Sequence, residues 1–241
     1  MLFGSTCRSL RALWRSNDQL AAAIPFERLL GINDFRDYTL SLESLFNRER
    51  TIGMDGYLFL DVEWADARRH ICSIAYQRTS YDGLLLNSHY QLVNPLCDFD
   101  PMTQRVHGIT EEMVAQEPTF DVVWNEELGE LIESNVVVAH CAKTADCPAL
   151  YRSLESFEME LPRLLYIDTG EMARQVLGGR KYGLSTCCDY YGISLDQHHD
   201  ALCDTNACRE LFWRLAQEIE VPDPKPYVFG GGAKRNTARW R

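Results

Sequence analysis

The chain has 241 residues, of which 46% are hydrophobic and 24% are charged. This length and composition suit one or two globular domains with a sizeable core, and the apolar runs are too short to span a membrane. The net charge of −11 argues against a protein that coats nucleic acid through bulk positive charge. The acidic excess lies in residues 57–220, which hold 27 acidic and 12 basic residues. Such a segment either repels phosphate or holds divalent cations that attract it.

The nine cysteines are an odd number with no secretory signal before them, which argues against a disulfide framework and predicts a reducing, cytoplasmic location. Residues 1–17 contain three arginines and no acidic residue, a composition that also resembles an organelle transit peptide. We favour the interpretation of these residues as a short surface helix.

The hydrophobic pattern divides the chain into three parts. Residues 1–54 predict a helical N-terminal extension, and residues 55–221 predict a globular domain. Residues 222–241, with five basic residues and one acidic residue, predict a basic, flexible C-terminal tail. This tail is expected either to hold nucleic acid or to serve only solubility.

In chain order, the globular domain begins with strands over residues 57–64, 70–76 and 84–93, whose short connections predict an antiparallel meander. The rest of the domain alternates helices with two short, buried strands. Helices are expected over residues 101–107, 110–115, 119–132, 145–157, 169–177, 183–191 and 201–219, and strands over residues 135–140 and 164–168. This order predicts an α/β or α+β domain built on a mixed sheet.

Two acidic residues stand at the end of the first predicted strand. Because residues i and i+2 of a strand point to the same face, Asp61 and Glu63 share a face, about 6.6 Å apart. Each charge needs a partner, and the strand holds no Lys or Arg. Carboxylates suit magnesium or manganese, so the pair predicts a divalent-metal site. The alternative is a strand end in solvent with both acids hydrated.

Two further segments carry candidate catalytic residues. His199 precedes the last long helix and Asp204 lies inside it, so the histidine is suited to take up a proton near neutral pH beside a carboxylate. The alternative is that Asp200 caps the helix and the histidines lie on the surface. Asp146 stands in the first turn of the helix after the strand over residues 135–140, where it either joins the site or complements the helix dipole.

Together and in this order, the motifs resemble the DEDD-type 3′–5′ exonucleases of the histidine subgroup, which includes the proofreading epsilon subunit of bacterial DNA polymerase III and ribonuclease T. The first family motif corresponds to Leu-Asp-Val-Glu at residues 60–63. A His-Gly-Ile-Thr turn lies at residues 107–110, and the second motif corresponds to residues 138–146. The third motif, His-x-Ala-Leu-x-Asp, is complete at residues 199–204. The resemblance covers residues 57–218.

The chain departs from the family pattern by one inserted residue and three replaced residues. The second motif has one additional residue between His140 and Asp146, with Cys141 in place of the asparagine and Ala145 in place of the phenylalanine. An inserted residue rotates a helix start by about 100° unless a bulge absorbs it. Trp64 stands where the family has a small residue, so it either narrows the pocket or stacks on a base.

The resemblance implies a ribonuclease H-like fold, a mixed five-stranded sheet flanked by helices, with residues 1–54 as an extra helical segment. It implies a metal-dependent exonuclease that hydrolyses phosphodiester bonds at the 3′ end of DNA or RNA and releases nucleoside 5′-monophosphates. Asp61, Glu63, Asp146 and Asp204 would hold two Mg²⁺ or Mn²⁺ ions, and His199 would deprotonate the attacking water.

The resemblance also implies contacts with the substrate by Val62, Trp64, His107 and Ile109. For His107 and Ile109, a purely local role in a turn and helix cap is the alternative, and His140 is expected to be structural. The expected partner is single-stranded nucleic acid with a free 3′ end, with no membrane and with any polymerase partner left open.

Two other functions compete with this prediction. The altered second motif allows a catalytically impaired exonuclease fold that only binds nucleic acid or protein. A structural adaptor acting through residues 1–54 is the other alternative.

Overall fold

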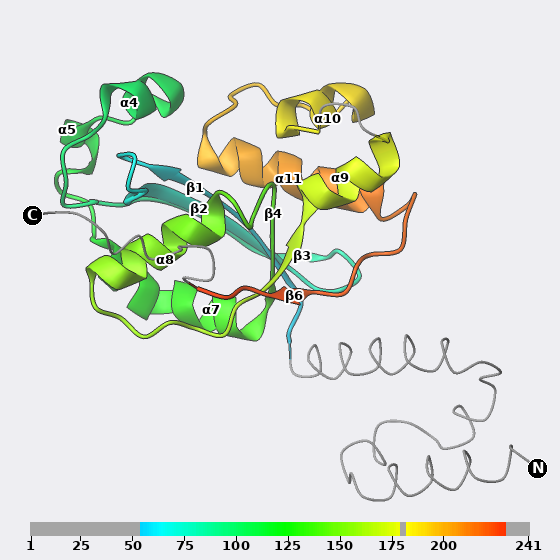
Figure 1. Cartoon of the computed structure of the whole chain (residues 1–241), viewed down its shortest axis with the longest axis horizontal. Coiled ribbons are helices and arrows are strands. Elements are labelled where there is room, and N and C mark those ends of the chain that lie inside the picture. Colours follow the sequence, from blue (N-terminus) through cyan, green and yellow to red (C-terminus); the bar gives the residue numbers. More distant parts are fainter. Residues whose placement is uncertain (1–53, 179–181, 230–241) are drawn as a thin grey trace, which may run out of the picture. The chain divides into compact units, whose positions relative to one another are not determined.

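The computed structural model describes residues 54–178 and 182–229. These residues form a mixed sheet with the strand order β3-β2-β1-β4-β5-β6 and with helices on both faces (Figure 1). The strands are Tyr57–Trp64 (β1), Ile71–Thr79 (β2), Leu85–Leu92 (β3), Val136–Ala139 (β4), Leu165–Asp168 (β5) and Lys225–Pro226 (β6). The mixed sheet expected from the sequence is confirmed, and β6 adds a sixth strand to the five that were predicted.

The connections between strands determine which strands are parallel. Strands β1, β2 and β3 are joined by short turns and pair as an antiparallel meander, whereas β4 and β5 follow helical crossovers and extend the sheet in parallel with β1. The C-terminal ends of β1, β4 and β5 therefore meet at one edge of the sheet. This edge is where α/β proteins commonly place their ligands.

The helices match the predicted segments closely, with one exception. The helix expected over residues 119–132 is divided by a wide π-helical turn, in which the Gly129 N–H donates to the Trp124 carbonyl oxygen five residues earlier. None of the helices within the described ranges has both the length and the apolar content needed to cross a bilayer. The helices are Pro101–His107 (α4), Glu111–Val114 (α5), Phe120–Val123 (α6), Trp124–Leu128 (η2), Gly129–Ser134 (α7), Asp146–Ser156 (α8), Thr169–Leu177 (α9), Leu184–Tyr191 (α10) and Ala201–Leu215 (α11).

The two faces of the sheet carry separate hydrophobic cores, and β1 contributes to both. Leu58, Leu60 and Val62 pack into the core on the side of α7 and α8. Phe59 packs into the core on the side of α9, α10 and α11, against Phe212 with ring centroids 5.4 Å apart. Because side chains alternate along a strand, residues 61 and 63 face the same side as Phe59, toward α11.

The C-terminal segment differs from its prediction. Lys225–Pro226 pairs with β5, and the Tyr227 N–H donates to the Leu164 carbonyl oxygen at 2.9 Å. Tyr227 and Phe229 pack against the core on the side of α8. The folded domain thus continues beyond residue 221, because two aromatic side chains in the predicted tail find an apolar surface to cover. The rest of that tail, the helical extension at residues 1–53 and the transit-peptide-like residues 1–17 lie outside the described residues.

The core on the α11 side generates a stability prediction. Leu211 is fully buried in α11, whereas Leu161 in the loop before β5 is 47% exposed. We expect Leu211→Ala to lower the free energy of unfolding by about 2–5 kcal/mol, because it removes a buried side chain and leaves a cavity. Leu161→Ala serves as the matched control and is expected to change it by less than about 1 kcal/mol. Chemical denaturation measures both, and equal effects would contradict this division of the core.

Candidate active site

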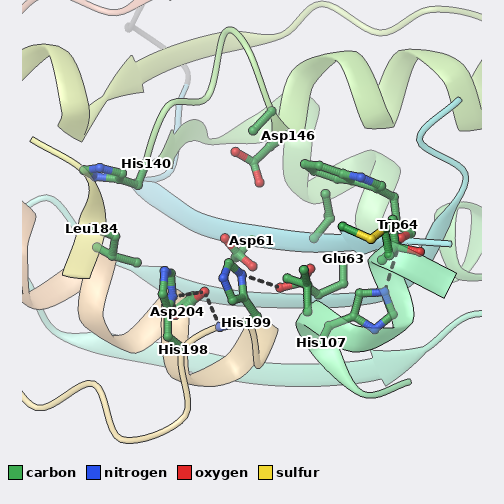
Figure 2. Close-up of a pocket in the computed structure, with 15 residues that line it drawn as sticks. Asp61, Glu63, Trp64, His107, His140, Asp146, Leu184, His198, His199 and Asp204 are labelled. Carbon is green, nitrogen blue, oxygen red and sulfur yellow. Dashed lines mark hydrogen bonds and ion pairs between the residues drawn. The ribbon is translucent and has the colours of Figure 1, made fainter. Parts of the chain in front are cut away.

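A hollow of about 370 Å³ opens at the C-terminal edge of β1 and β4 (Figure 2). Its wall combines a cluster of carboxylates and histidines with an apolar rim. The lining residues are Asp61, Val62, Glu63, Trp64, Met102, Thr103, Val106, His107, His140, Ala145, Asp146, Leu184, His198, His199 and Asp204.

Three of the predicted metal ligands lie together in this hollow. Asp61, Glu63 and Asp204 each offer a carboxylate oxygen, and these oxygens lie within 4.8 Å of one another. The alternation of β1 turns the first two toward α11. Asp200 caps α11 by accepting a hydrogen bond from the Cys203 N–H, so Asp204 stands in the first turn of the helix and faces the strand.

The fourth predicted ligand, Asp146, also lines the hollow and lies on the other side of Asp61 from Asp204 (Figure 2). The residue inserted before it is absorbed in a turn. Cys141 adopts a left-handed conformation with φ of 61°, and its N–H donates to the Asp168 carboxylate at 3.0 Å. The N–H groups of Thr144 and Ala145 then donate to the Cys141 carbonyl oxygen. The helix start is therefore not rotated away, and the Asp146 side chain is buried in the hollow.

The outer side of the same turn is held by Arg69. Its guanidinium donates to the Thr144 carbonyl oxygen at 2.5 Å and lies 3.4 Å from that of Ala145. It also lies 5.3 Å from the ring centroid of Trp64, so one arginine connects the end of β1 with the turn before Asp146. The sequence did not single out this residue, because the two segments that it joins are far apart in the chain.

Burial and crowding raise the pKa values of the carboxyl groups. Burial, followed by the charges of Asp146, Asp204 and Glu63, raises the pKa of Asp61 well above its usual range. Burial and the charges of Asp204 and Asp146 raise the pKa of Glu63 to about 8. The pKa of Asp146 rises to about 8, mainly through burial, although its own backbone N–H and the charge of Arg69 oppose the rise. These carboxylates disfavour one another when no cation is present.

The donor set fits divalent metal ions. One carboxylate oxygen of Asp61 and one of Asp146 are buried without a hydrogen-bond partner among the described residues. Unpaired buried carboxylate oxygens are costly, and hard oxygen donors are the preferred ligands of magnesium and manganese. The residues that could hold such ions are therefore Asp61, Glu63, Asp146 and Asp204.

Two histidines lie beside the carboxylates. The ring of His199 approaches Glu63 with its Nδ1 at 4.0 Å from Oε1, and its backbone N–H donates to Asp204 at 3.0 Å. His198 lies with Nδ1 3.0 Å from both carboxylate oxygens of Asp204, and its ring stacks on that of His199. Burial, followed by the charge of His198, lowers the pKa of His199. Only His199 was predicted as a site residue, although the adjacent pair of histidines was the signal for both.

His140 has no free ring nitrogen. Nε2 donates to the Tyr182 carbonyl oxygen and Nδ1 accepts from the Thr169 hydroxyl, both at 2.9 Å. Burial lowers its pKa, which favours this neutral form. These contacts agree with the structural role expected for His140.

The predicted substrate contacts divide into two groups. Val62, Trp64 and His107 line the hollow, whereas Ile109 does not. The turn at Gly108, with φ of 76°, and a hydrogen bond from the Ile109 N–H to His107 Nδ1 direct Ile109 into a small core, where it is 5% exposed.

Helix α4 supplies part of the hollow that the sequence analysis missed. Met102 and Val106 line it while 63% and 50% exposed, respectively, and α4 buries none of its residues. Leu184, at the start of α10, lines the hollow as well. The signal in the sequence was two large apolar residues in a short helical segment that is otherwise mostly polar.

The carboxylate cluster makes the stability of the metal-free protein depend on pH. Glu63 has an ordinary pKa of 4.5 in the unfolded chain and about 8 in the fold. As pH rises through that window, the unfolded state releases its proton first, so we expect the free energy of unfolding to fall, by about 1.4 kcal/mol per pH unit for one such group. Glu63→Gln should reduce this slope, and Mg²⁺ should add more stability at pH 8 than at pH 5.

Thermal unfolding of the chelator-treated protein at a series of pH values measures this dependence. Glu210→Gln, at an exposed position of α11 outside the hollow, is the control and should leave the slope unchanged. A slope in Glu63→Gln equal to that of the unsubstituted chain would contradict the role assigned to the burial and crowding of Glu63.

Much of the chain is similar in sequence to known proteins. Residues 51–212 match the RNase T model, described as an exonuclease. DNA polymerase III PolC-type of Thermotoga petrophila is 28% identical over 146 residues, which are 58% of this chain and 10% of that protein. The same protein of Clostridium perfringens is 27% identical over 179 residues, 71% of this chain and 12% of that protein. The chain thus spans about a tenth of the length of these curated relatives.

Solved structures share the fold. The nuclease domain of 3′hExo, a DEDDh family member bound to rAMP, has a TM-score of 0.61 at 15% identity, covering 73% of this chain and 98% of that one. Exonuclease X in complex with 5′ overhanging duplex DNA has a TM-score of 0.56 at 23% identity, covering 69% and 95%. With two thirds of its length matched by the family model, the chain belongs to the RNase T exonuclease family, the family predicted from its motifs.

Proposed function

We propose that this domain is a metal-dependent 3′–5′ exonuclease, which removes nucleoside 5′-monophosphates from the 3′ end of DNA or RNA. The observation that carries the proposal is the group of four carboxylates around one hollow, with unpartnered buried oxygens on Asp61 and Asp146. Membership of an exonuclease family supports a phosphodiester as the bond that is cleaved.

The 3′ polarity and the substrate class draw support from the structural neighbours. One neighbour is a nuclease domain bound to rAMP, and another is Escherichia coli exonuclease I in complex with a dA16 oligonucleotide. We infer that the hollow accepts the terminal nucleotide of a single strand. The apolar side chains of Trp64, Met102 and Val106 would pack against its base or sugar.

Asp61, Glu63, Asp146 and Asp204 would hold two Mg²⁺ or Mn²⁺ ions. When bound, such ions neutralise the phosphate and stabilise the attacking and leaving oxygens of an in-line displacement. The residues of the chain would position the phosphate beside the end of β1, where these carboxylates line the hollow.

His199 would accept the proton of the attacking water. Its side chain is 43% exposed, so water reaches the ring, and the neighbouring carboxylate of Glu63 would stabilise the imidazolium that forms. His198, through its contact with Asp204, would orient that carboxylate.

The free thiols of the eight cysteines from Cys72 to Cys208 suit the reducing cytoplasm predicted from the sequence.

The alternative of an impaired exonuclease fold was motivated by the residue inserted before Asp146. Since the turn beginning at Cys141 absorbs the insertion and Asp146 still faces the hollow, this residue no longer favours the alternative. The test is therefore catalytic.

A single-stranded oligonucleotide labelled at its 5′ end should be shortened stepwise in Mg²⁺, with 5′-monophosphates as the products. Asp61→Asn should lower the rate by about 10³-fold or more, because it removes a charge from the centre of the cluster. Glu210→Gln is the charge-matched control and should retain the full rate. If the unsubstituted chain binds the oligonucleotide but never shortens it, the impaired fold is the better description.

Substitution can distinguish the roles of the adjacent residues His198 and His199. We expect His199→Ala to lower kcat by about 10²–10⁴-fold, as the loss of a general base does. His198→Ala should have a smaller effect on kcat and should weaken activation by Mg²⁺, because its partner is Asp204. Steady-state kinetics at several Mg²⁺ concentrations distinguishes the two roles, and a reversed order of effects would assign proton transfer to His198.

A further inference from the structure

A second hollow, of about 810 Å³, lies next to the candidate active site and has the opposite charge. Arg68, Arg69 and Arg152 line it and outnumber its single carboxylate, that of Glu155. Residues 57–220 contain only 12 basic residues against 27 acidic ones. Three of those 12 therefore gather at one place on an acidic domain.

The two hollows share a wall. Thr144 lines the basic hollow and the next residue, Ala145, lines the active-site hollow. Arg69 lines the basic hollow, while its guanidinium contacts Trp64 at the rim of the other. A chain that leaves the active site across this turn therefore enters the basic hollow directly.

The positive charges in the basic hollow are largely available to a ligand. Within residues 54–178 and 182–229, Arg68 and Arg69 make no ion pair with a carboxylate, and the Arg69 guanidinium donates to the backbone carbonyl oxygens of the turn. Arg152 pairs with Glu155 at 2.6 Å, but both side chains are half exposed. Such exposed pairs contribute little stability, so Arg152 can exchange its carboxylate for a phosphate.

We propose that the basic hollow binds the phosphodiester backbone of the substrate strand on the 5′ side of its terminal nucleotide. This inference rests on the proposed exonuclease function, because it needs a strand whose 3′ end lies in the acidic hollow. Guanidinium groups suit phosphate through paired N–H donors. The Thr144 and Ser156 hydroxyls donate to the Cys141 and Ser153 carbonyl oxygens, so the arginines supply the donors to the phosphate. The hollow contributes affinity for strands longer than a dinucleotide, without selecting a base sequence.

The test compares the binding of short and long strands. Fluorescence anisotropy in Mg²⁺ gives the dissociation constants of a labelled dinucleotide and a labelled octanucleotide, both with phosphorothioate linkages that slow hydrolysis. For the Arg68→Ala/Arg152→Ala double variant, we expect octanucleotide binding to weaken roughly tenfold or more, with dinucleotide binding changed less than twofold. The logarithm of the association constant of the octanucleotide decreases with the logarithm of the salt concentration. The double variant should make this slope less steep by about 1.4, because two phosphate contacts are lost.

One control variant makes the result specific. Arg214→Ala removes an exposed arginine of α11 that lines neither hollow, so it should leave both dissociation constants unchanged. Arg69 is not substituted, because it holds the turn before Asp146. An unchanged octanucleotide constant, or equal weakening for both lengths, would overturn the proposal.

A third substrate, a duplex with a recessed 3′ end, tests whether the basic hollow binds the complementary strand instead. If the double variant weakens binding of this duplex but not of the single octanucleotide, the hollow holds the complementary strand and the proposal is wrong. Because binding is measured without turnover, the outcome is independent of catalysis. A failure of the proposed function would show instead as an absence of hydrolysis by the unsubstituted chain.

Discussion

Repulsion between carboxylates that share one hollow is the constraint on which the rest of this site depends. Asp61 lies between Asp146 on one side and Asp204 on the other (Figure 2), and no Lys or Arg is among the described residues that line the hollow. The packing of the domain supplies the energy that holds these groups together, because β1, α8 and α11 are each anchored in a hydrophobic core. A cation would convert this repulsion into attraction, so an arrangement that is unfavourable without metal is also suited to binding it.

The turn between β4 and α8 shows how the fold tolerates a change in a motif. An inserted residue would rotate Asp146 by about 100° if the helix simply started one residue later. Cys141 instead takes a left-handed conformation, which a non-glycine residue adopts only when its surroundings favour it. The Asp168 carboxylate and Arg69 provide those surroundings from the two sides of the turn. The motif therefore keeps its carboxylate through contacts made by residues outside the motif.

The parts of the site that could be predicted from the sequence are those fixed by local rules. Asp61 and Glu63 could be placed on one face because strand alternation is a local rule, and Asp204 could be placed because a capped helix fixes its first turn. Periodicity likewise predicted all the long helices. The burial of Ile109 outside the hollow could not be predicted, because its motif gives a turn but not the direction of the side chain, which the tight bend at Gly108 decides. Arg69 and β6 act through contacts between segments distant in the chain, and no local pattern reports such contacts.

The net charge of −11 is a poor guide to how this chain meets a polyanion. At physiological ionic strength the Debye length is about 8 Å, so a phosphate senses mainly the charges of the wall that it touches. The acidic hollow and the hollow lined by Arg68, Arg69 and Arg152 adjoin each other across one turn, yet they present opposite signs. An acidic composition and a phosphate-binding surface are therefore compatible. Metal ions from solution would supply the positive charge at the carboxylates, and the arginines would supply it along the backbone of the nucleic acid. The uneven distribution of charge, rather than its sum, carries the functional information.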